Sequence, residues 1–225
     1  MRAKHIIAID GPSGAGKGTV ARAVAARLGY RHIDTGAMYR ALGWLALHEG
    51  IELTDETAVA ALGERATFDL ENGRVVIDGH DVRTAIRTPE MDKAATAVAR
   101  HPAVRRVLVA RQRAYDQGAG VVMEGRDIGT VVFPDADVKI YLDASPEERA
   151  RRRAADPAHT SSKSSQLADV ATALAERDKN DSTRAASPLT IAPDAVVIDT
   201  TGVPIDDVIE RVLALAEARS SGELP

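Results

Sequence analysis

Cysteine is absent from all 225 residues of this sequence. A disulfide framework and a thiolate metal site are therefore both excluded. A chain without cysteine fits a reducing compartment, and we expect the protein to be cytoplasmic. Aromatic residues are also scarce, at 3% against 44% for all hydrophobic residues, so we expect a core of aliphatic side chains and alanine.

Long apolar runs are missing as well. No stretch approaches the roughly 20 residues that a membrane-spanning helix needs. The first residues, Met1 to Lys4, lead straight into a predicted strand, unlike a secretory signal. We therefore expect no membrane partner. The net charge of −4 argues against a general nucleic-acid binder, so an anionic ligand would have to be met by arginines gathered at one place.

The most informative stretch covers residues 11–19 and is rich in glycine. It follows an apolar run at 5–10 that predicts a strand, and it leads into a helical pattern at 19–28. Strand, glycine-rich turn and helix are the context of a phosphate-binding loop, where backbone N–H groups and the helix dipole hold phosphates. Lys17 would then lie across the outer phosphates of a nucleoside triphosphate. A glycine-rich turn with a surface lysine is the alternative, but it would not require this spacing.

One position departs from the usual phosphate-loop pattern. The residue after Lys17 is Gly18, and a hydroxyl comes only one position later, at Thr19. The side-chain hydroxyl that many P-loop proteins offer to a magnesium ion is therefore missing at its usual place. A second apolar strand, predicted at 120–124, ends in the carboxylate of Glu124, a residue type that such enzymes place beside their metal.

Two further segments point to an anion site. Thr35 is predicted to cap a helix, which puts Arg40 near the helix N-terminus, although a capped helix with a solvated arginine explains the segment equally well. Arg126 and Asp127 lie between two glycines after the strand at 120–124. That is the sheet edge where α/β proteins bind ligands, and a purely structural loop is the alternative.

The middle of the chain changes its pattern. Turn residues at Asn72-Gly73 and Asp78-Gly79 separate short apolar runs and predict a small β insertion over residues 66–83, by default a structural one. Two helices are predicted after it, at 89–100 and 102–117.

Arginines dominate much of the last third. A predicted helix capped by Ser145 carries several of these arginines and is followed by a Ser-rich loop at 156–165. This pattern is typical of a mobile flap over phosphates. A solvated basic helix is a nearly equal alternative. A later helix starting at Gln166 holds Arg177, Asp181 and Arg184 at spacings i, i+4 and i+7. These side chains would share one helical face, either in a site or on a salt-bridged surface.

Taken together, the segments resemble the bacterial cytidylate kinases of the nucleoside-monophosphate kinase family, over about residues 5 to 218. The phosphate loop alone indicates only a P-loop protein, whereas the later motifs are specific to this family. The resemblance rests on GPSGAGKGT at 11–19, DTGAMYR at 34–40, GRDIGTVVFP at 125–134, IYLDAS at 140–145, ERD at 176–178 with Asp181 and Arg184, and SPL at 187–189.

The resemblance implies an α/β fold, a P-loop NTPase-type parallel sheet flanked by helices. It also implies a monophosphate-binding insertion containing the small β patch, and a short lid. The whole chain, 1–225, would be a single kinase domain. Its core would cover about 1–34, 118–148 and 182–219, its monophosphate-binding part about 35–117, and its lid about 149–165.

The implied reaction transfers the γ-phosphoryl group of ATP to CMP or dCMP, with Mg²⁺ as cofactor. The partners would be the nucleotides ATP, CMP and dCMP, without nucleic acid, and the protein would be a monomer. Glu124 would act on the metal through a water molecule. ATP would be bound by Gly11, Pro12, Ser13, Gly14, Ala15, Gly16, Lys17, Gly18 and Thr19. CMP would be bound by Thr35, Arg40, Thr96, Arg105, Arg126, Asp127, Arg177, Asp181 and Arg184.

Within this family pattern, catalysis would depend on Lys17, Arg126 and Arg184 together with a lid arginine. The lid candidates are Arg149, Arg152 and Arg153, of which we select Arg153. Asp127 would accept a hydrogen bond from the exocyclic amine of cytosine. Uracil would present a carbonyl there and cost about 1–3 kcal/mol, so we expect CMP to be preferred over UMP.

Two rival interpretations remain at this stage. The first is another small-molecule kinase on the same scaffold, such as an adenylate or shikimate kinase; the Arg126-Asp127 loop and the β insertion argue against it. The second is a nucleotide-binding protein without catalysis, and the many arginines of the acceptor half argue against that.

Overall fold

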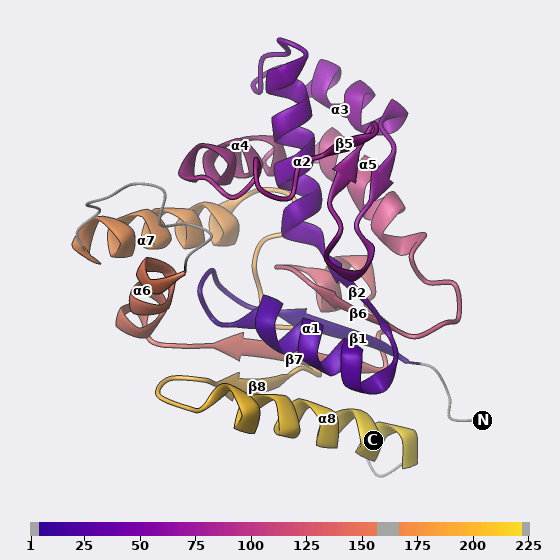
Figure 1. The fold of residues 1–225 in the computed structure, drawn as a ribbon, viewed down its shortest axis with the longest axis vertical. Coiled ribbons are helices and arrows are strands. Elements are labelled where there is room, and N and C mark those ends of the chain that lie inside the picture. The colour runs from indigo at the N-terminus through magenta and orange to yellow at the C-terminus, as the bar shows by residue number, and fades with distance from the viewer. Residues whose placement is uncertain (1–4, 157–166, 222–225) are drawn as a thin grey trace.

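A parallel sheet of five strands organises the computed structural model, which describes residues 5–156 and 167–221 (Figure 1). The strand order is β2-β6-β1-β7-β8, and every neighbouring pair is parallel. The strands are β1 (Ile6–Asp10), β2 (Arg31–Asp34), β6 (Val121–Glu124), β7 (Val138–Asp143) and β8 (Val196–Asp199). The predicted α/β fold with a helix-flanked parallel sheet is confirmed.

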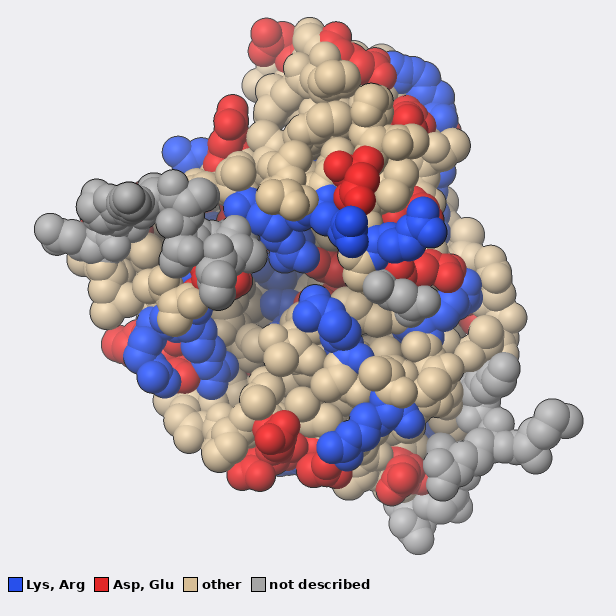
Figure 2. Space-filling model, viewed as in Figure 1, with Lys and Arg blue, Asp and Glu red and all other residues tan. Residues whose placement is uncertain are grey.

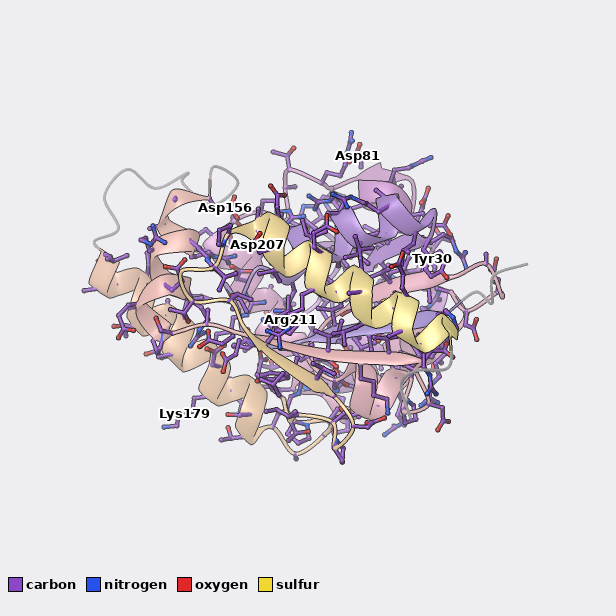
Figure 3. All side chains as sticks on the ribbon, turned by 90° about the horizontal axis from the view of Figure 1, so that it is seen from below. Tyr30, Asp81, Asp156, Lys179, Asp207 and Arg211 are labelled. Carbon is purple, nitrogen blue, oxygen red and sulfur yellow. The ribbon has the colours of Figure 1, made fainter. Side chains whose placement is uncertain are left out.

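Helices cover the sheet because its central strands are apolar on both sides. Residues of α1 (Lys17–Leu28) and α8 (Ile205–Ser221) pack on one face in a core that includes Ile7, Ile9 and Leu142. A second cluster around Ala8 and Met123 includes residues of α5 (Pro102–Arg113) and of the π-helical turn η2 (Ile128–Val132). Figure 3 looks onto α8, with Asp207 and Arg211 labelled, as it crosses the sheet.

A separate hydrophobic core holds the middle of the chain together. It includes Met38, Leu42, Leu62, Ile77 and Leu108, and it lies above the main sheet in Figure 1. The middle of the chain forms α2 (Thr35–His48), α3 (Glu56–Arg65), α4 (Pro89–Ala99), α5, the 3₁₀ turn η1 (Glu71–Gly73), and the antiparallel strands β3 (Phe68–Asp69), β4 (Val76–Ile77) and β5 (His80–Asp81).

The predicted β insertion is present, but its two turns differ. Asp78 and Gly79 have φ of 46° and 81°, the left-handed pair that joins β4 to β5 in a tight hairpin. Asn72 and Gly73 instead belong to η1, so the connection between β3 and β4 is longer than a two-residue turn.

The prediction that Thr35 caps α2 is wrong. Asp34 is the N-cap, and its carboxylate accepts a hydrogen bond from the Ala37 amide at 2.8 Å. Asp34 ends β2 with an extended backbone, which is the conformation of a cap, while Thr35 is already helical. The Thr35 hydroxyl donates instead to the backbone carbonyl of Glu124 at 2.7 Å, which ties α2 to the end of β6.

Residues 149–155 of the predicted lid belong to α6 (Pro146–Ala155), which lies beside α7 (Leu167–Thr183) at the edge of Figure 1. Ser145 caps α6 as predicted, accepting from the Glu148 amide. Residues 157–165 of the predicted lid, and the predicted helix start at Gln166, lie outside the described residues. None of the described helices has the length and apolar character needed to cross a membrane.

Candidate active site

A large polar cavity opens above the carboxyl ends of β1 and β6. Its lining comes from the phosphate loop, α1, α2, the 83–88 segment, the 124–126 segment, α6, α7 and the segment before α8. A narrower cavity lies between α2, α4 and α7. Gly36, Gly125, Arg126 and Arg177 line both cavities, so the two cavities adjoin at these residues. Lys and Arg side chains surround the hollow visible in Figure 2, with carboxylates between them.

Close contacts with neighbouring backbone leave no room for a Cβ at two glycines of the phosphate loop. Gly11 has a φ of 145°, and a Cβ there would lie 2.0 Å from the Leu142 carbonyl oxygen of β7. Gly14 has a φ of 83°, and its Cβ would lie 3.0 Å from the backbone oxygen of Arg149 on α6. Gly16 caps α1 in a left-handed conformation without a side-chain cap, which leaves the first N–H groups of α1 available to an anion.

Lys17 is the cation of this loop. Its side chain is buried, and Nζ donates to the Pro12 carbonyl at 2.7 Å. Burial, with a smaller effect of Arg126, lowers the pKa of Lys17 from 10.5 to about 7. A phosphate that enters the loop would favour the charged ammonium again.

Glu124 occupies the space beside Gly18. A Cβ on Gly18 would lie 3.1 Å from Oε1 of Glu124, so the glycine leaves room for this carboxylate. His32 Nε2 lies 3.1 Å from the same oxygen and both side chains are buried, which holds the carboxylate in place. Within 5–156 and 167–221, no group of three or more His, Cys, Asp and Glu residues could ligate a metal by itself.

Asp10 was not among the predicted site residues. It is buried at the end of β1 and accepts hydrogen bonds from the amides of Ile128 and Gly129 at 2.9 and 2.8 Å. Burial raises the pKa of Asp10 to about 6. Its two hydrogen bonds fix the loop that carries Arg126 and Asp127 against the sheet.

Predicted acceptor residues form a chain of alternating charges in the narrower cavity. Arg126 Nε donates to Asp181 at 2.9 Å, and Asp181 lies 3.6 Å from Arg184. Arg184 lies 3.5 Å from Asp127, which accepts a hydrogen bond from Arg105. Thr96 lines the same cavity. The resulting row of hydrogen-bonding groups comes from the loop after β6, from α5, and from α7 and the residue just beyond its end.

A second group of charges lies where the two cavities meet. Arg40 pairs with Asp34 at 3.1 Å and lies 4.0 Å from Asp92. Asp92 also pairs with Arg177 and with Arg153, so residues of α2, α4, α6 and α7 converge there. Sequence reasoning missed Asp92 because its partners are far away in the chain.

The three candidate lid arginines have different partners. Arg149 donates to the Ser13 carbonyl at 3.2 Å and pairs with Asp178, so it supports the phosphate loop. Arg152 donates to the hydroxyl and the carbonyl of Thr200 at 2.9 and 2.6 Å. Arg153 alone of the three pairs with the acceptor side, through Asp92.

Comparison with known proteins gives the family. The cytidylate kinase family model matches residues 7–218. The cytidylate kinase of Solibacter usitatus is 47% identical over 220 residues, covering 95% of this chain and 93% of that protein. That of Pelotomaculum thermopropionicum is 49% identical over 217 residues, covering 94% and 96%.

Solved structures agree on the fold. The shikimate kinase of Acinetobacter baumannii aligns with a TM-score of 0.50 at 16% identity, covering 96% of this chain and 95% of that one. A gluconokinase from Sinorhizobium meliloti aligns equally well at 17% identity, covering 98% and 97%, again with a TM-score of 0.50. At such identities only the kinase fold is shared. With the relatives above, the phosphate loop and the adjoining arginine-rich cavity show that the chain belongs to the cytidylate kinase family of ATP-dependent phosphotransferases.

Proposed function

We propose that the protein transfers the γ-phosphoryl group of ATP to CMP or dCMP, giving ADP and CDP or dCDP. The observation that carries this proposal is that two adjoining cavities share Arg126 and Arg177 in their walls. One cavity contains the phosphate loop and the other ends in the buried pair of Asp127 and Arg105. A donor triphosphate and an acceptor monophosphate can therefore meet between these arginines.

For the donor, we propose that the backbone of residues 11–19 and the Lys17 ammonium hold the ATP phosphates. Thr19 lines the same cavity and is exposed to it. The adenosine would extend along Thr200, Val203 and Ile205, which line the same cavity.

Mg²⁺ fits this site as an ion held mainly by phosphates and water. Of the two buried carboxylates beside the loop, Asp10 and Glu124, only Glu124 lines the cavity, and the space beside Gly18 is left to it. We propose that Glu124 accepts a hydrogen bond from a water of the ion. When bound with ATP, the ion would supply neutralisation of phosphate charge.

For the acceptor, we propose that Arg40, Arg126 and Arg177 meet the CMP phosphate. The pairing of Arg177 with Asp92, beside Arg153, favours this place for Arg177. Asp181 and Arg184 would then face the ribose, within the row of charges that leads to the base pocket.

Recognition of the base would depend on Asp127. Its carboxylate is buried and is paired with Arg105 and Arg184, and carboxylate oxygens accept hydrogen bonds. The exocyclic amine of cytosine is a donor that can bind to such an acceptor. Thr96 and Thr35 line the same cavity and would complete the pocket.

Catalysis in this proposal is electrostatic. The acceptor is already a phosphate oxyanion, so no strong base is needed, and the barrier is lowered by charge placed around the transferred group. Lys17 and Arg126 approach it from the donor and acceptor sides. Arg153 is the lid arginine that reaches the acceptor side in the described part of the chain, which supports its selection.

We also propose that the kinase works as a cytoplasmic monomer, with the cysteine-free composition as support for the compartment. Light scattering after gel filtration tests the monomer.

A coupled assay of ADP formation with CMP, dCMP, UMP, AMP and shikimate tests the reaction. We expect the highest kcat/KM with CMP or dCMP, a lower value with UMP, and turnover reduced by orders of magnitude in Lys17→Ala. A best rate with AMP or shikimate, or no rate with any acceptor, would refute the proposed function.

A further inference from the structure

One carboxylate lies among the arginines that we assign to the acceptor phosphate. Asp92, in the first turn of α4, has Oδ1 2.9 Å from Arg177 Nη1 and 4.0 Å from Arg40 Nη1. Its Oδ2 accepts a hydrogen bond from Arg153. An acid at this place requires an explanation, because it repels the phosphate that the same arginines would bind.

The arginines themselves indicate what the acid does in the empty site. The side chains of Arg40, Arg153 and Arg177 are only 9%, 20% and 16% exposed, so water screens their mutual repulsion poorly. Burial lowers the pKa of both Arg153 and Arg177, and the charge of Asp92 is the largest influence that opposes this lowering. Asp92 therefore supplies the negative charge that keeps these guanidinium groups together.

A phosphate would supply negative charge to the same guanidinium groups. A carboxylate and a phosphate both present pairs of oxygens that accept hydrogen bonds from guanidinium groups. The Asp92 oxygens lie within reach of arginines from α2, α6 and α7, which is the arrangement expected around a bound phosphate. When a phosphate is present, the two anions must share these donors.

We propose that Asp92 is an internal counter-ion that takes the place of the acceptor phosphate in the empty enzyme and competes with CMP for Arg40, Arg153 and Arg177. The inference rests on the proposed function, because it requires the CMP phosphate at this junction. Asp92 would be a positioning residue. It holds the arginines ready while it weakens CMP binding.

The opposite expectation comes from a purely structural ion-pair cluster. In that case Asp92 would keep its partners when nucleotide binds, and its removal would scatter the arginines and weaken CMP binding. The two cases differ in sign, and they differ again for cytidine, which carries the same base and ribose without the phosphate.

The test compares Asp92→Asn with the wild type by titration calorimetry, using CMP and cytidine as ligands. Glu90→Gln is the matched control, because Glu90 lies in the same turn of α4 and is exposed. We expect Asp92→Asn to lower the CMP Kd roughly tenfold by removing one nearby negative charge. The cytidine Kd should not change, Glu90→Gln should behave as wild type, and added salt should reduce the gain.

An unchanged or higher CMP Kd in Asp92→Asn would overturn the inference, as would equal changes for CMP and cytidine. These outcomes leave the proposed function intact if wild type still phosphorylates CMP, whereas a wild type that binds no CMP would overturn both. Thermal melting verifies the fold. If Asp92→Asn does not fold by itself, CMP should restore its folding and cytidine should not, because only CMP brings the replacing negative charge; failure of CMP to restore the fold would overturn the inference.

Discussion

Binding of Mg·ATP at pH 8 should draw a proton onto Lys17. In the empty enzyme the pKa of this lysine is lowered to about 7, first by burial and then by Arg126. At pH 8 about nine tenths of the enzyme would therefore carry a neutral amine. Triphosphate oxygens beside Nζ favour the ammonium, so each ATP that binds should bring about 0.9 proton with it at pH 8, about 0.5 at pH 7 and about 0.1 at pH 6.

The measurement is calorimetric titration with a non-hydrolysable ATP analogue and excess Mg²⁺ at pH 8, in buffers of different ionisation enthalpy. The slope of observed enthalpy against ionisation enthalpy gives the number of protons taken up. At this pH the acid Asp10, with a pKa raised to about 6, is ionised before and after binding and adds little. Lys17→Arg is the matched control, because a guanidinium stays charged and should give a slope near zero.

A wild-type slope near zero at pH 8 would refute this reasoning. So would a slope that Lys17→Arg retains, because the proton would then belong to another group. Either result would mean that the ammonium keeps its charge in the empty loop, despite its burial.

Three substitutions test other parts of the site. Asp127→Asn should raise the KM for CMP and reduce the ratio of kcat/KM for CMP to that for UMP, because an amide can also donate to the uracil carbonyl. Steady-state kinetics with both acceptors measure this ratio. An unchanged ratio would contradict the role of Asp127 in recognising the base. Gly18→Ala places a Cβ 3.1 Å from the Glu124 carboxylate. The kcat should therefore fall and the Mg²⁺ concentration needed for activity should rise, with little change in Tm. An unchanged Mg²⁺ dependence would show that this carboxylate does not act on the ion. Gly11→Ala should lower Tm strongly, because its Cβ would lie 2.0 Å from the Leu142 carbonyl oxygen of β7. Gly29→Ala is the control, since Gly29 also has a positive φ but has open space around it, and it should lower the free energy of unfolding by only about 1 kcal/mol. Equal losses of stability in the two variants would refute the close-contact argument.

Sequence reasoning succeeded where the relevant information is local. The phosphate loop was predicted because strand, glycines and helix are adjacent, and the loop of Arg126 and Asp127 because it follows an apolar strand. Positions of the strand ends then bring these segments to one edge of a parallel sheet. The cap of α2 was missed by one residue, because Asp34 and Thr35 are both good caps and only the pairing of β2 decides between them.

The rest depends on contacts between distant segments. Asp92 looks like an ordinary acid in the first turn of a helix until α6 and α7 are placed against it. His32 and Glu124 are 92 residues apart, and their contact is visible only once β2 pairs with β6. The lid arginines are nearly equivalent by spacing, yet Arg149 and Arg153 reach the phosphate loop and the acceptor side respectively.

The contact between the phosphate loop and α6 limits where the proposed lid could bend. Gly14 lies against the backbone of Arg149, whose guanidinium also binds the Ser13 carbonyl and Asp178 of α7. The start of α6 is therefore tied to both the phosphate loop and α7. If α6 bends over the acceptor without disturbing the phosphate loop, the bend has to lie between Arg149 and Arg153, the arginine that pairs with Asp92 of α4.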